Sequence, residues 1–88
     1  MLIGKVTGNV WATRKHDGLR GQKLMVVEII EHGKDVSSSS MVCADIIGAG
    51  IGETVLIARG GAARKALLPN EAPIDACIIG IIDDVEVQ

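Results

Sequence analysis

Aromatic residues are almost absent from this chain: its 88 residues contain one Trp, no Phe and no Tyr. Proteins that bind single-stranded nucleic acid usually stack bases on aromatic rings within a basic groove. Here Trp11 is the sole ring, the net charge is −2, and the Lys and Arg residues form no long basic block. Nucleic acid is therefore not expected as a partner, and Trp11 is expected to pack in the core or in an interface.

Side chains arranged so that they could catalyse a reaction or bind a metal are also few. The two histidines, His16 and His32, fall in predicted turns, and no His, Cys or carboxylate stands at a metal-ligand spacing from them. Asp83 and Asp84 are adjacent, so on a strand they point to opposite faces and cannot share a proton. A run of four serines lacks a plausible histidine base. We expect no metal, no cofactor and no enzymatic activity.

Cysteines and long apolar runs are few as well. Cys43 and Cys77 both lie in apolar segments that read as strands, and the chain starts without the pattern of a signal peptide. We expect both to be reduced core residues rather than a disulfide or a metal pair. No stretch approaches the roughly 18 apolar residues of a membrane helix, so no membrane partner is expected.

The chain is instead rich in aliphatic residues. Hydrophobic residues make up 48% of it, with 12 Ile and 9 Val, and β-branched side chains favour strands. Residues 1–88 are enough for one small domain. Apolar patterning and turn residues predict five strands and one short helix, at 2–10, 23–30, 41–47, 54–58 and 76–87, and at 61–68. The predicted fold class is mainly β: a small five-stranded OB-like β-barrel with one short helix.

The predicted last strand suggests an oligomer. Cys77 falls on one face, Ile78 and Ile82 fall on the other, and neither face carries a polar residue before Asp83. An apolar outer face must be covered, so Ile78 and Ile82 are candidates for a subunit interface. The alternative is a strand buried on both faces within one domain. A chain this small is also expected to be marginally stable alone.

A glycine-rich loop separates the third and fourth predicted strands. It resembles a phosphate loop, but a strand follows it where a helix would be needed, and it contains no Gly-Lys-Ser/Thr. A tight turn that packs against another backbone, including that of a second copy, explains it better. Its residues are Gly48, Ala49, Gly50, Ile51 and Gly52.

Charged residues flank this loop and the predicted helix. Arg59 or Arg64 of one subunit could pair with Asp45 or Glu53 of another, which would fix the register of an interface. The alternative is a solvated mixed surface, on which each exposed pair contributes about 0–1 kcal/mol.

Several motifs in fixed order resemble one family over nearly the whole chain. The segments 4–13, 21–25, 45–56, 59–64 and 75–83 are similar to the EutN/CcmL family of pentamer-forming vertex proteins of bacterial microcompartments. The resemblance implies the same barrel and a structural role: a homopentamer that caps the vertices of a polyhedral shell in the bacterial cytoplasm. Carboxysome, ethanolamine, propanediol and glycyl-radical types would share this pattern.

The resemblance also implies where contacts lie. The loop from Gly48 to Gly52 would approach the five-fold axis and line a narrow central opening. The rim would meet hexameric shell proteins, with Arg14, Lys15 and Arg20 as candidate rim residues, unless their loop is only a solvated hairpin tip. The alternative function is an OB-type module that binds single-stranded nucleic acid or a small ligand.

Overall fold

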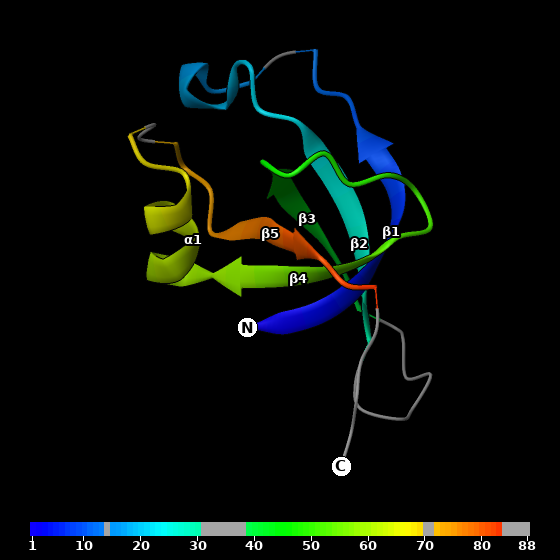
Figure 1. Cartoon of the computed structure of the whole chain (residues 1–88). Coiled ribbons are helices and arrows are strands. Elements are labelled where there is room, and N and C mark those ends of the chain that lie inside the picture. The colour runs from blue at the N-terminus through cyan, green and yellow to red at the C-terminus, as the bar shows by residue number, and fades with distance from the viewer. Residues whose placement is uncertain (14, 31–38, 70–71, 84–88) are drawn as a thin grey trace.

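The computed structural model describes residues 1–13, 15–30, 39–69 and 72–83. Its strands close into a barrel in the order β1-β2-β3-β5-β4, in which β3 and β5 are parallel and the other pairs antiparallel (Figure 1). The predicted five-stranded barrel with one short helix is confirmed. The elements are β1 (Leu2–Val10), β2 (Leu24–Ile30), β3 (Ser40–Asp45), β4 (Thr54–Arg59), α1 (Gly60–Ala66) and β5 (Ala76–Ile81), with a 3-10 turn at Asp17–Leu19.

A bulge changes the orientation of β1 half-way along its length. Val6 pairs with Val27 of β2 and Gly8 pairs with Val26, so Thr7 has no partner in the register. Opposed residues of an antiparallel pair share a face, and Val27 is buried whereas Val26 is only partly covered. The side chains of β1 therefore stop alternating regularly between the barrel interior and the outside at Thr7. From Gly8 onward the strand turns a different face to the interior.

The first three residues of β5, Ala76, Cys77 and Ile78, are buried by their own chain. Ile78 is 0% exposed and lies in the barrel core with Val6, whereas Cys77 packs in a second cluster with Ala63 and Leu67 of the helical segment. Figure 1 shows α1 lying against β4 and β5, where it covers this outer side. Ile78 is therefore already buried within one chain, and the prediction that it lies in a subunit interface was wrong.

Large apolar side chains remain exposed elsewhere on the described surface. Trp11 is 90% exposed, which excludes the core as its location in a single chain. The other exposed large hydrophobic residues are Met1, Ile30, Val42, Ile46, Ile47, Ile51, Leu68 and Ile81. Where exposed apolar residues form a contiguous patch, that patch is typical of a contact with another chain.

The two cysteines are buried and unpaired, as predicted. Burial, with the nearby Cys77 and Asp75, raises the pKa of the Cys43 thiol to about 11. Burial and the charge of Asp45 also raise the pKa of Cys77. Both thiols are therefore protonated at neutral pH and poorly reactive. In the described ranges, no helix has the length and hydrophobicity needed to span a membrane.

Gly4 is required by packing rather than by backbone conformation. A Cβ at this position would meet the Val27 side chain and lie 2.9 Å from the Glu28 carbonyl oxygen. We expect Gly4→Ala to lower the free energy of unfolding by about 1–3 kcal/mol. The measurement is urea unfolding at a fixed protein concentration, because association adds to apparent stability.

Gly8→Ala is the matched control, because a Cβ there has nothing within 4 Å. It should change the free energy of unfolding by less than about 0.5 kcal/mol. Equal losses in the two variants would contradict this account of the barrel core.

Candidate functional site

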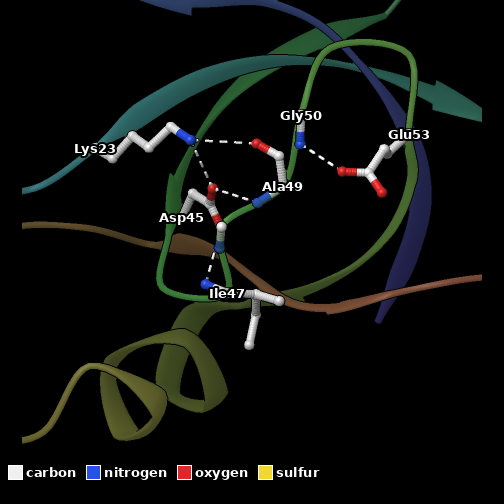
Figure 2. Close-up of polar contacts among 7 residues, drawn as sticks. Lys23, Asp45, Ile47, Ala49, Gly50 and Glu53 are labelled. Carbon is white, nitrogen blue, oxygen red and sulfur yellow. Dashed lines mark hydrogen bonds and ion pairs between the residues drawn. The ribbon is translucent and has the colours of Figure 1, made fainter.

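The glycine loop (residues 46–53), which joins β3 to β4, is held by the carboxylate of Asp45. Oxygen Oδ1 accepts hydrogen bonds from the backbone N–H groups of Ile47 at 2.9 Å and Gly48 at 3.0 Å. Oxygen Oδ2 accepts a third bond from the N–H of Ala49 at 2.8 Å (Figure 2). One side chain thus fixes the first half of the loop.

Lys23, just before β2, completes this cluster. Its Nζ lies 3.4 Å from Asp45 Oδ2 and donates to the Ala49 carbonyl at 3.2 Å. The Asp45 side chain is 0% exposed, and burial alone would raise its pKa. The three N–H donors and Lys23 outweigh burial and hold the pKa of Asp45 below its ordinary value of 3.8. The carboxylate is therefore charged, and its charge is satisfied within the chain.

The second half of the loop is fastened to β1. Glu53 Oε1 accepts from the N–H of Gly50 at 2.6 Å, and Gly52 donates to the Val6 carbonyl at 2.8 Å. Gly48 and Gly52 both have φ of +93°, a conformation that any other residue adopts only with strain. The glycines thus allow the turns, and the carboxylates hold them in place.

These contacts revise the predicted pairing of two carboxylates. Asp45 and Glu53 were considered as partners of Arg59 and Arg64 in another subunit, yet both carboxylates bind the backbone of their own loop. Both arginines are exposed, Arg59 at the end of β4 and Arg64 in α1. The role of Asp45 was missed, although an Asp just before a glycine-rich turn often bonds the N–H groups that follow it.

The five loop residues proposed to line an opening do not all face outward. Ala49 is 1% exposed and belongs to the barrel core, whereas Ile51 is 63% exposed. Substitution of Ala49 by Trp would therefore disrupt the core of a single chain before it affected any assembly. Ile51, with Ile46 and Ile47, presents the exposed side chains of the loop.

A groove of about 660 Å³ lies beside the glycine loop. Its lining includes Trp11 and Leu24, the exposed Lys15, and Ala49 and Ile51 of the loop. The rest of the lining comes from the end of β1 and the residues after it, from the start of β2 and the residues before it, and from the loop: Asn9, Val10, Ala12, Thr13, Gln22, Lys23, Met25 and Gly50. The loop held by Asp45 thus forms one wall of a partly apolar groove whose largest exposed side chain is an indole.

Two of the predicted rim residues, Lys15 and Arg20, lie in the short connection before β2. Arg20 Nε bonds Asp17 Oδ1 at 3.0 Å, and His16 Nδ1 accepts from the N–H of Gly18 at 2.9 Å. Leu19 packs against the cluster beneath α1. The connection is therefore more than a solvated hairpin tip. Lys15 is exposed, and Arg14 lies outside the described residues.

Within the described residues, no group of three or more His, Cys, Asp or Glu side chains could hold a metal ion. The most elaborate polar cluster in this part of the chain binds the protein's own backbone. A small closed barrel with a fixed loop and an exposed apolar surface is typical of a structural module that associates with other chains.

Comparison with known proteins agrees with that class. The family described as "Ethanolamine utilisation protein EutN/carboxysome" matches residues 1–83. The shell vertex protein EutN of Escherichia coli K12 is 41% identical over 97% of this chain and 90% of its own length. The carboxysome shell vertex protein CcmL of Synechococcus elongatus is 42% identical over 100% and 89%. The chain belongs to the EutN/CcmL family.

Solved structures show the same fold. CcmL of Nostoc sp. PCC 7120 superposes with a TM-score of 0.91 at 42% identity, covering 100% of this chain and 93% of that one. The pentameric shell protein GrpN of Rhodospirillum rubrum gives a TM-score of 0.89 at 39% identity, with full coverage of both chains. This likeness extends over the barrel, the helix and the glycine loop.

Removal of the Asp45 carboxylate should release the glycine loop. We expect Asp45→Ala to lower the free energy of unfolding by about 2–3 kcal/mol, because three N–H groups and Lys23 lose a charged partner. The measurement is urea unfolding together with hydrogen exchange of the loop amides. Asp45→Asn is the matched control, since its amide oxygen keeps one acceptor for the loop N–H groups while the charge and the second acceptor oxygen are lost.

The stabilisation should depend on pH in a defined direction. The folded-state pKa of Asp45 lies below its ordinary value of 3.8. The contribution of Asp45 to the free energy of unfolding is therefore complete above pH 3.8, and it is lost as the pH falls through the lower folded-state pKa. Asp45→Asn should lack this acid-sensitive part. Identical stability profiles of wild type and Asp45→Asn below pH 3.8 would contradict the assigned role of the carboxylate.

Proposed function

We propose that this chain is a structural shell protein of a bacterial microcompartment, in which five copies form a ring that caps a vertex. The observation that carries the proposal is full-length similarity to proteins of that function. GrpN, described as a pentameric microcompartment shell protein, matches over 100% of both chains. EutN and CcmL are both named shell vertex proteins. The shell would lie in the bacterial cytoplasm.

The glycine loop is our proposal for the part of each copy nearest the five-fold axis. Its backbone is fixed by Asp45 and Glu53 before any association, and Ile51 projects from it. A preformed loop costs little conformational entropy when copies converge. The exposed Arg59 and Arg64 and the half-buried Ile82 remain proposed contacts between neighbouring copies.

Hexameric shell proteins are the proposed partners at the outer rim. Lys15 and Arg20 are exposed in a connection that the Leu19 packing and the Arg20–Asp17 pair hold in shape. Flat layers of six-fold units need five-fold units to close into a polyhedron. A cationic rim element on the five-fold unit would help to select its neighbours.

One observation favours the alternative function. An exposed Trp11 beside a groove with Lys15 and Lys23 is one element of a site for single-stranded nucleic acid. However, the Lys23 amine is already bonded to Asp45 and to the Ala49 carbonyl. The relatives are shell proteins, so the structural role is preferred.

Native mass measurement tests the proposed function. We expect a particle of five times the 9.2 kDa chain, because a ring of copies covers the apolar surface that one copy exposes. A persistent single chain at micromolar concentration, with salt-dependent binding of an oligonucleotide, would instead support the binding module.

The rim proposal has its own test. Arg20→Glu should leave the mass of the ring unchanged, since this side chain is exposed and does not line the groove beside Trp11, and should abolish co-purification with co-expressed hexameric shell proteins. Lys65→Glu is the matched control, because it makes the same change in net charge at another exposed position. Equal co-purification of the two variants would exclude the proposed rim contact.

A further inference from the structure

Trp11 is the most exposed large hydrophobic residue of the described chain, at 90%. It directly follows β1 and borders the groove of about 660 Å³ whose other wall carries Ala49 and Ile51. A Trp side chain buries roughly 150–250 Å² when it is covered. The exposed indole beside a partly apolar groove is therefore the kind of surface that another chain covers.

The glycine loop also exposes aliphatic side chains away from this groove. Ile46 and Ile47 are about as exposed as each other, at 46% and 45%, and neither lines the groove. Figure 2 shows Ile47 at the opposite end of the loop from Gly50, on the side of β5 and α1. One rigid loop thus carries a groove wall at one end and a projecting aliphatic side chain at the other.

We propose that Ile47 of one copy enters the groove beside Trp11 of the next copy around the ring. This inference rests on the proposed function, because it requires a ring of identical copies. A ring of five is built from heterologous contacts, in which two different surfaces of the same chain meet. The groove and the Ile46–Ile47 projection are two such surfaces, and the same Asp45-held loop sets their relative position.

The area that this contact would bury suits a second copy. A stable interface buries about 800 Å² on each partner, so Trp11 alone would supply roughly a fifth to a third of that area. Trp is also among the side chains that contribute most to binding free energy when they are fully covered. Ile51, at the rim of the same groove, adds apolar area on the same surface.

Disulfide trapping tests the contact directly. The double variant Trp11→Cys with Ile47→Cys should give, after mild oxidation, covalent products of up to five chains on a denaturing gel. Trp11→Cys alone and Ile47→Cys alone are the matched controls and should remain single chains. Both sites are exposed, so folding should survive, and the natural thiols are buried with raised pKa values and should not take part.

The natural fluorescence of Trp11 gives a second readout without substitution. Because the chain contains no other Trp and no Tyr, quenching by acrylamide reports on this ring alone. In the assembled ring, quenching should be several-fold weaker than in the urea-unfolded chain. A single folded copy leaves the indole open, so such protection must come from a neighbour.

The outcomes separate this inference from the proposed function. An intact five-chain mass without covalent products, or with Trp11 quenched as in the unfolded chain, would overturn the contact and leave the vertex function standing. Protection of Trp11 only after an oligonucleotide is added would also overturn it. A wild-type protein that stays a single chain would remove the ring itself, and the contact with it.

Discussion

The rest of the structure depends on the hydrogen bonds and the ion pair that the buried Asp45 carboxylate makes within its own chain. Its two oxygens bond three consecutive N–H groups, and Lys23 balances the charge from the β2 side. Charge-assisted bonds of this kind are stronger than neutral ones. They convert a segment with two left-handed glycines, Gly48 and Gly52, into a fixed connection between β3 and β4. Without them, the first half of the loop, which carries Ala49 and the exposed Ile46 and Ile47, would lose the bonds that fix it.

The barrel and the assembly use different apolar surfaces. The barrel interior and the cluster beside α1 bury Ala76, Cys77 and Ile78 of β5 within one chain, so Ile78 contributes to folding rather than to association. The exposed large apolar side chains of one copy include Trp11 and the isoleucines of the glycine loop. Folding and ring formation are therefore separable, and variants at these exposed positions can weaken assembly without unfolding the barrel.

Local patterns in the sequence were enough to predict the barrel, the short helix, the buried thiols and the family. They failed where long-range packing decides the outcome. The face of β5 with Ile78 lies in the barrel interior, and the opposite face, with Cys77, packs beside a helix whose position the sequence alone does not fix. The bulge at Thr7 comes from pairing with β2. The carboxylate of Asp45 satisfies its own loop rather than a neighbour, and Ala49 is a core residue because that carboxylate turns the loop inward. In each case the deciding contact joins segments that are far apart in sequence or is made by the backbone.

The central claim is that five copies close around the loop that Asp45 holds. The most direct test is to measure distances between spin labels attached at Ile51→Cys in the assembled ring, where the buried natural thiols should remain unlabelled. Five labels close to the axis form a small pentagon. The account therefore predicts two short distances between labels, one for adjacent copies and one for copies two positions apart. Labels separated by the full width of the ring would place the loop at its outer edge and would contradict the account.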